Sequence, residues 1–493
     1  MLFSSMLFLW IFLPVVIIGN FILSVAGFKE EETRIRAKNV FLLVASLIFY
    51  AWGDVNYLFI MLSSIALNYV GGRIIGDAKT HRKGKLALVV ALNLGILFVF
   101  KYFNMVVVVI ESILSFEGNA LQLLQNMLSM QGTGELGLPY IVLPIGISFF
   151  TFQAMSYVID VYYEKTKVQK SLFAFALYVS FFPQLVAGPI VKYSDIAEQL
   201  KTRKETVATF VSGQKRFCYG LAKKVLLANT FAEVADKIWS LETSALGAGV
   251  AWLGILAYTL QIYYDFSGYS DMAIGIGRML GFEFKENFNY PYTSLSVQEF
   301  WRRWHISLST WFKEYVYIPL GGNRRGNKRT YLNIFIVFFL TGVWHGANFT
   351  FFVWGMMYAL LQILERLFLG KWLEKNPVKI INWIYCMLAV MVGWVFFRAD
   401  TVFQAVTYLQ QMFAGSTSYY TVISFLSMKV IVVFAIGILF AGGVQRLLKE
   451  KYEKVKYSLP VMACDLCIQA VTLVLCIFMM VSGTYNPFIY FQF

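Results

Sequence analysis

The chain has 493 residues, of which 58% are hydrophobic, 18% aromatic and only 14% charged. Soluble globular domains carry about a quarter charged residues, so this composition excludes an ordinary soluble domain. The formal net charge of +14 does not indicate a nucleic-acid-binding protein, because the Lys and Arg residues are confined to short loops between apolar segments. That distribution is the pattern of the positive-inside rule for membrane proteins.

Apolar segments of about 18 residues or more recur along nearly the whole chain, and a bilayer-spanning helix needs that length. These unbroken runs differ from the short alternating segments of a membrane β-barrel. We therefore expect an all-α polytopic membrane protein with about 10–12 transmembrane helices, together with re-entrant and surface helices. A single domain over residues 1–493 is predicted, because the sequence contains no evident soluble domain or internal repeat.

The first apolar segment, residues 1–27, is followed by the first positive charge, Lys29. A secretory signal has its basic region first, so we predict a retained span whose N-terminus lies outside the cytoplasm. Residues 39–75 predict a helical hairpin that breaks near Trp52. Basic loops then alternate with loops poor in Lys and Arg. This alternation also places the C-terminus outside, after a final span at 459–482.

Three later stretches carry topological signals. The chain between Lys101 and Lys165 contains no Lys or Arg, so its acidic loop at 117–135 should lie outside the cytoplasm. Residues 171–190 end in PQLVAGP, whose prolines and glycine break a helix at membrane depth and predict a re-entrant element. A strongly basic loop is expected at 446–456.

Residues 247–281 form a long apolar stretch that contains Asp265 and Asp271. Carboxylates at membrane depth are costly and indicate either function or pairing. Either Asp can orient a histidine, but pairing with a buried Lys or Arg is the favoured interpretation. Tyr264 is a candidate to donate a hydrogen bond to a developing oxyanion. The glycines that follow do not match the dinucleotide-binding fingerprint, and we expect them to allow close helix packing.

Residues 299–358 hold two of the three histidines of the chain, His305 and His345. His345 lies between two uncharged runs, 331–344 and 346–364. An ionisable side chain within a membrane segment is by default a functional-site hypothesis, and imidazole is suited to proton transfer near neutral pH. The alternative is a hydrogen-bonded structural histidine that packs two helices together.

The residues around His305 are candidates for binding the phosphates of a donor such as coenzyme A. On a continuous helix, Trp301 and His305 would share one face. Lys and Arg here can equally serve as topological or lipid-headgroup charges, which is the favoured interpretation for the loop at 324–329. Asn348 is a further candidate oxyanion donor. The candidate donor-binding residues are Arg302, Arg303, Trp304 and Lys313.

Several longer motifs then point to one family. They are FSSMLFLWIFLPVV, LLVASLIFYAWG, LPIGISFFTFQAMSYVIDVY, FFPQLVAGPI, QIYYDFSGYSDMAIGIGRMLGFEFKENFNYPY, EFWRRWHISLSTWFKEYVYIPLGGNR, LTGVWHGANFTFFVWG and the terminal FIYFQF. With these motifs the chain resembles the membrane-bound O-acyltransferase (MBOAT) family over its full length. The resemblance is to the bacterial branch of alginate O-acetyltransferase-like proteins.

The resemblance implies an enzyme that passes an acyl group, usually acetyl, from a cytoplasmic thioester donor such as acetyl-CoA through the membrane. The acceptor is an exported polysaccharide or a partner protein that serves it. It also implies a fold in which helices surround a thin core, with cytoplasmic and extracellular funnels meeting at a central histidine. That histidine corresponds to His345, as the general base, and the second family histidine corresponds to His305. Direct transfer is expected ahead of a covalent acyl-enzyme, with no bound cofactor and no metal site.

Other functions stay open on the sequence. D-alanyl transfer from a carrier protein to teichoic acid uses the same fold and histidine, and a glycan or ion transporter or an inactive scaffold are the remaining classes. We expect the chain to lie in the bacterial inner membrane among lipids, with no nucleic-acid partner. An extracytoplasmic acyltransferase or acetyl-carrying protein is predicted to dock near the acidic loop at 117–135 or near FIYFQF.

Overall fold

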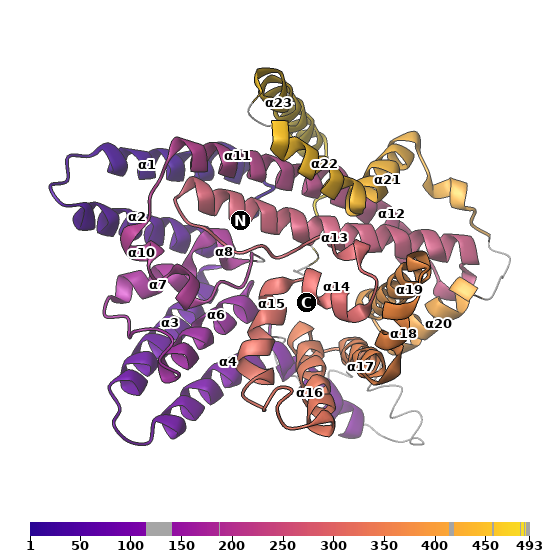
Figure 1. Ribbon diagram of the computed structural model, residues 1–493, viewed down its shortest axis with the longest axis horizontal. Coiled ribbons are helices and arrows are strands. Elements are labelled where there is room, and N and C mark those ends of the chain that lie inside the picture. The colour runs from indigo at the N-terminus through magenta and orange to yellow at the C-terminus, as the bar shows by residue number, and fades with distance from the viewer. Residues whose placement is uncertain are drawn as a thin grey trace.

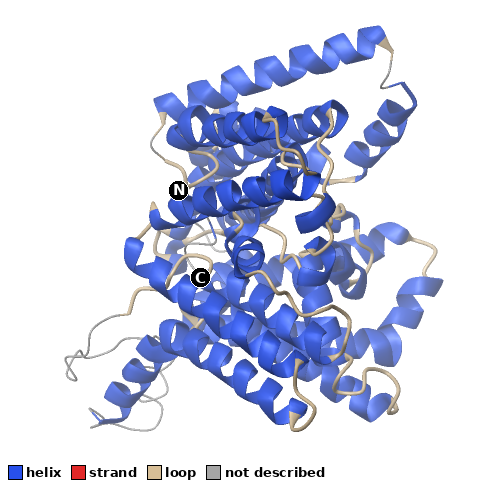
Figure 2. Ribbon diagram, turned by 90° about the vertical axis from the view of Figure 1, so that its left-hand side faces the viewer, coloured by secondary structure: helices blue, strands red, loops and turns tan. Residues whose placement is uncertain are grey.

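A computed structural model describes residues 1–114, 141–186, 188–413, 419–455, 458–483, 485–487 and 489. Within these ranges every regular element is a helix (Figure 2). The predicted all-α class is therefore confirmed. The acidic loop at 117–135, where a partner was predicted to dock, lies outside the described residues, as does all of FIYFQF except Ile489.

The helices follow one another closely along the chain (Figure 1). The α-helices are α1 Leu13–Val25, α2 Glu31–Ala51, α3 Val55–Gly76, α4 Arg82–Leu114, α6 Ile147–Tyr162, α7 Leu172–Ser180, α8 Phe182–Leu185, α9 Tyr193–Ile196, α10 Gln199–Thr202, α11 Val207–Ala222, α12 Asn229–Trp239, α13 Ala248–Met279, α14 Val297–Arg303, α15 Ile306–Phe312, α16 Asn327–His345, α17 Phe349–Leu364, α18 Gly370–Lys375, α19 Lys379–Arg398, α20 Val402–Phe413, α21 Met428–Ala441, α22 Gly443–Val455 and α23 Leu459–Ser482. Short π-helical turns at Phe8–Phe12, Lys223–Ala228, Lys313–Tyr317 and Glu365–Leu369 continue some of them, and 3₁₀ turns lie at Thr243–Ala245, Pro291–Thr293 and Val422–Phe425.

Six helical segments among the described residues are long and apolar enough to cross a membrane: Phe8–Val25, Val55–Gly76, Arg82–Leu114, Phe349–Lys375, Lys379–Arg398 and Leu459–Ser482. The protein is thus a multi-pass membrane protein. Other long helices, such as α2 and α13, carry charged residues within their apolar sequences. The larger count of 10–12 spans stays a prediction.

Several predicted breaks are found where the sequence placed them. α2 ends at Ala51 and α3 begins at Val55, with the Asp54 side chain accepting a hydrogen bond from the Asn56 N–H at 2.8 Å. The segment after α7 breaks at Phe181. Its freed Phe182 N–H donates to Ser46 Oγ at 3.1 Å, as a buried break requires. The expected basic loop at 446–456 was wrong, because α22 continues as a helix to Val455.

α13 lies in the middle of the molecule with α11 and α12 packed along it (Figure 1). Most of its residues are buried. Glycines permit this closeness: a Cβ on Gly275 would lie 2.7 Å from the Gly213 carbonyl oxygen, and one on Gly268 would lie 2.8 Å from the Gly220 carbonyl oxygen. The expected close packing at Gly275 is confirmed.

The hairpin of α16 and α17, which carries His345, is held by a second glycine contact. A Cβ on Gly342 would lie 2.5 Å from the Phe351 carbonyl oxygen, and one on Gly355 would lie 2.5 Å from the Phe338 carbonyl oxygen. Both obstacles are backbone atoms, which cannot rotate away as a flexible side chain can. The two helices can therefore approach this closely only with glycine at both positions.

Gly342→Ala is expected to destabilise the protein by about 1–3 kcal/mol, because overpacking forces the two helices of the hairpin apart. Thermal unfolding in detergent micelles measures the change. Gly95→Ala is the matched control, because Gly95 also lies inside a helix but has open space where its Cβ would be. Equal unfolding temperatures for the two variants would contradict the close-packing argument.

Candidate active site

His345 is the last residue of α16, and its side chain is buried. Its ring packs edge-on against Trp354 and Phe397, each with ring centroids 4.9 Å away. No hydrogen bond to the imidazole is found among the described residues. The ring is therefore positioned by packing, which leaves its nitrogens available for a proton.

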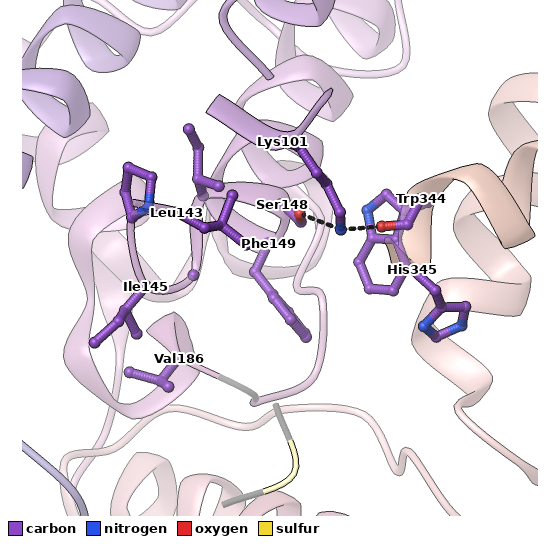
Figure 3. Close-up of a pocket in the computed structure, with 11 residues that line it drawn as sticks. Lys101, Leu143, Ile145, Ser148, Phe149, Val186, Trp344 and His345 are labelled. Carbon is purple, nitrogen blue, oxygen red and sulfur yellow. Dashed lines mark hydrogen bonds between the residues drawn. The ribbon is translucent and has the colours of Figure 1, made fainter. Parts of the chain in front are cut away.

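The end of α16 is capped by two neighbouring residues of α4. The last carbonyls of a helix lack partners within the helix and need donors from elsewhere. Lys101 Nζ donates to the Trp344 carbonyl, and the Tyr102 hydroxyl donates to the Val343 carbonyl. Figure 3 shows the ammonium between Trp344 and Ser148, whose Oγ it reaches at 3.3 Å. α4 thereby fixes the backbone that presents His345.

His305 does not lie on a continuous helix, so the expectation that Trp301 and His305 share a helix face was wrong. α14 ends at Arg303, and His305 adopts a left-handed conformation with φ 44° before α15 begins. Such a backbone is uncommon for a residue with a side chain and is typical of functional sites. His305 Nδ1 lies 3.2 Å from Asn287 Oδ1, while Nε2 is buried without a hydrogen-bond partner among the described residues.

Trp344 joins the two histidines. Its ring centroid lies 5.0 Å from that of His345 and 6.2 Å from that of His305. Phe149, at the start of α6, packs against both Trp344 and His305. Two histidines that are 40 positions apart in the sequence thus meet at one tryptophan.

Two small cavities touch His345, and among the described residues it is the one residue that lines both. The first has about 30 Å³ of space for water and is lined by Lys101, residues 143–149, Val186, Trp344 and His345 (Figure 3). The second has about 10 Å³ and is lined by Ile262, Phe266, Trp304, His345, Trp354, Trp394, Phe397 and Ile489. One water needs about 10–15 Å³ of such space, so the cavities hold about two waters and one water.

The predicted donor-binding residues fall into two groups. Trp304 is buried and lines the second cavity. Arg303 pairs with Glu299 at 2.7 Å, four residues earlier on α14. Arg302 and Lys313 are exposed, and the Arg302 guanidinium hydrogen-bonds to Gln298. The structure thus brings Trp304, but not the three cations, to the lining of the cavities at His345.

Asp265 forms a buried ion pair, as the favoured interpretation held. One carboxylate oxygen lies 2.7 Å from Lys224 Nζ, and the other accepts a hydrogen bond from the Ile489 N–H at 2.9 Å. Lys224 also donates to the Pro487 carbonyl. Since Ile489 lines the second cavity, Asp265 acts on the cavity wall through the C-terminal segment.

The remaining supporting candidates have structural partners. Asp271 pairs with Arg216 at 2.8 Å and with Lys223 at 2.7 Å. The Tyr264 hydroxyl donates to the Gly437 carbonyl at 2.6 Å. Asn348 caps α17 through the Thr350 N–H at 3.0 Å and donates to the Asp400 carbonyl. The hydroxyl hydrogen of Tyr264 and one of the two amide hydrogens of Asn348 are therefore already engaged.

Lys101 is the residue that the sequence reasoning missed. In the sequence it is the last cation before a stretch without Lys or Arg. The available signal was a lone cation inside the apolar segment that became α4. By the rule that drew attention to His345, such a residue is itself a functional-site hypothesis.

The fold and the site define a helical multi-pass membrane protein with two buried histidines that meet at Trp344, one of which, His345, lines two small cavities. The model of the MBOAT, membrane-bound O-acyltransferase, family matches residues 123–409, which include both histidines. The chain belongs to this family, and its members are acyltransferases.

Named relatives agree with this assignment. The chain is 42% identical to the probable alginate O-acetylase AlgI of Pseudomonas aeruginosa over 420 residues, which is 85% of this chain and 76% of the relative. It is 35% identical to the peptidoglycan O-acetyltransferase of Helicobacter pylori over 84% of this chain and 80% of the relative. The teichoic acid D-alanyltransferase of Bacillus subtilis is 28% identical over 47% of this chain and 60% of the relative.

Proposed function

We propose that this protein transfers an acetyl group from a cytoplasmic thioester, acetyl-CoA in the first place, for the O-acetylation of an exported cell-surface polysaccharide. The observation that carries the proposal is the position of His345, a buried imidazole that borders two cavities built from different helices. A base in that position can face a donor on one side and an acceptor on the other.

Relatives favour acetyl transfer to a polysaccharide over D-alanyl transfer. Those that match most of the chain are named for O-acetylation of alginate and of peptidoglycan. The D-alanyltransferase matches less than half of the chain and at lower identity. The acceptor is therefore proposed to be a hydroxyl of an envelope glycan, reached directly or through an extracytoplasmic partner protein.

In the proposed step, His345 removes the proton of the acceptor hydroxyl as its oxygen attacks the thioester carbonyl carbon. The tetrahedral oxyanion collapses, the carbon–sulfur bond breaks, and the leaving thiolate takes the proton from the imidazolium. The products are an ester and a thiol. Cavities that hold one or two waters are too small for a thioester, so side chains lining them must move when the substrates enter.

Orientation follows the positive-inside pattern, with basic loops in the cytoplasm and both termini outside the bacterial inner membrane. α16 has 19 residues and begins at Asn327, within the basic stretch 324–329. A helix of that length rises about 28 Å, nearly the thickness of the hydrocarbon core. The proposal puts His345 toward the extracytoplasmic side, where an exported acceptor can reach it, while the donor acyl group has to cross most of the bilayer.

The envelope polysaccharides of two strains, with and without the gene, test this function. We expect alkali-labile acetate on a surface glycan to disappear with the gene and to return on complementation. Mass spectrometry of the glycan distinguishes acetyl from D-alanyl esters. Loss of D-alanyl esters with acetate unchanged would replace acetyl transfer by D-alanyl transfer, and an unchanged glycan would refute both.

A further inference from the structure

Lys101 stands alone in its part of the chain. It is the only Lys or Arg between positions 86 and 164, and it lies on α4, one of the six membrane-crossing segments. Placing an ammonium at that depth is costly. Among the described residues no carboxylate lies within ion-pair distance of it, unlike Lys224, which is neutralised by Asp265.

Capping α16 does not by itself explain a charge at this position. Tyr102, the next residue, caps the adjacent carbonyl of the same helix end with a neutral hydroxyl. A neutral donor would serve the Trp344 carbonyl equally well at a lower desolvation cost. Lys101 Nζ also lies 5.5 Å from the centroid of the Trp344 ring. Such a cation–π contact offsets only part of the cost of a buried ammonium, so the positive charge needs a further reason.

The geometry around the ammonium supplies one. An ammonium has three donor hydrogens. Lys101 donates two of these hydrogens, to the Trp344 carbonyl and to Ser148 Oγ. One donor hydrogen remains. Lys101 and His345 both line the first cavity, and Trp344, whose carbonyl accepts from the ammonium, precedes His345 in the chain (Figure 3).

We propose that the Lys101 ammonium binds the carbonyl oxygen of the acyl thioester in the first cavity and stabilises the oxyanion that forms on it. This inference rests on the proposed acyl transfer. When the acceptor oxygen bonds to the carbonyl carbon, the π electrons move to the carbonyl oxygen, and Lys101 holds that negative charge by an N–H···O hydrogen bond. Lys101 keeps its three protons throughout, while His345 carries the proton from the hydroxyl to the thiolate. A fixed donor aimed at developing charge is typically worth about 10²–10³ in rate.

Three variants separate this role from helix capping. Lys101→Gln removes the charge but keeps an N–H donor for the Trp344 carbonyl, Lys101→Arg keeps the charge, and Tyr102→Phe removes only the neighbouring cap. The readout is the initial rate at which cells that carry the full-length protein incorporate isotope-labelled acetate into surface polysaccharide, normalised to the amount of membrane protein. Thermal stability of each purified variant in detergent is measured alongside.

We expect Lys101→Gln to lower the rate by at least about 100-fold, with Lys101→Arg recovering at least a tenth of the wild-type rate. Tyr102→Phe should stay within about threefold of wild type, since it removes one neutral hydrogen bond and leaves the charge of Lys101 in place. Equal losses for Lys101→Gln and Tyr102→Phe, or no recovery with arginine, would overturn the oxyanion role. If the glutamine variant fails to accumulate, Lys101→Met is read in its place.

The variant His345→Gln, measured in the same cells, distinguishes a failure of the proposed acyl transfer from a failure of the proposed role of Lys101. If labelled acetate never enters the glycan, or enters at the wild-type rate in His345→Gln, the proposed function itself fails. If His345→Gln abolishes incorporation while Lys101→Gln does not lower it, the function stands and only the role of Lys101 is refuted.

Discussion

Replacing His345 by glutamine is expected to lower the rate of acyl transfer by about 10²–10⁴-fold, the usual contribution of a positioned acid–base group. Glutamine approximates the size of the imidazole, so the contacts to Trp354 and Phe397 are largely filled. It cannot accept and return a proton near neutral pH. The loss should therefore appear in the rate of labelled acetate incorporation and not in protein abundance.

The matched control for this substitution is His81→Asn. His81 is exposed in a loop, and its backbone is left-handed with φ 56°, a conformation that asparagine tolerates. We expect its rate to equal that of the wild type. A His345→Gln protein that retains more than about a tenth of the wild-type rate would show that another group carries the proton.

The sequence predicted best those helices whose ends are marked by nearby residues, such as a turn or the end of an apolar run. The hairpin of α2 and α3 breaks at the turn near Trp52, and α23 covers the predicted final span. The break between α14 and α15 was missed because no Pro or Gly marks it. His305 takes a left-handed backbone because Asn287, 18 positions away, holds its loop through the Ser307 N–H and hydroxyl. That partner is set by tertiary packing.

The candidate site was predicted only in part, because some of its contacts are also set by tertiary packing. An imidazole in an apolar run identifies His345 by residue type alone. The ion pair of Arg303 with Glu299 was also readable, because residues four apart on a helix are neighbours. The meeting of His305 and His345 at Trp344 depends on how α14, α15 and α16 pack. No sequence spacing encodes that contact.

Lys224 and Asp265 form a contact that only the three-dimensional structure reveals. On the sequence alone, pairing with a buried Lys or Arg is the favoured interpretation of Asp265, but nothing distinguishes Lys224 as its partner among the many basic residues. The structure buries both, with side chains only 2% and 3% exposed, and joins them at 2.7 Å. Neither side chain can move away without leaving a buried charge behind, so their pairing is a structural requirement near the site.

Asp265→Ala is expected to lower the free energy of unfolding by about 3–5 kcal/mol, because it removes one member of a buried ion pair. It also removes the acceptor of the Ile489 N–H, so the segment 485–489 should become more accessible to protease. Unfolding in detergent micelles measures the first effect, and limited proteolysis of the intact protein measures the second.

The double variant Asp265→Leu with Lys224→Met tests whether the stability lost in Asp265→Ala comes from the unbalanced charge or from the lost packing. Replacing both members of a buried pair by apolar groups is often neutral, so we expect it to recover most of the lost stability. Asp271→Ala is the control at a less buried pair, where Arg216 keeps Glu286 as a partner. Its cost should be near the ~1 kcal/mol of a partly exposed pair. If Asp265→Ala costs no more than Asp271→Ala, the buried charge is already screened, and the second cavity beside His345 must be open to water from the side of the C-terminal segment.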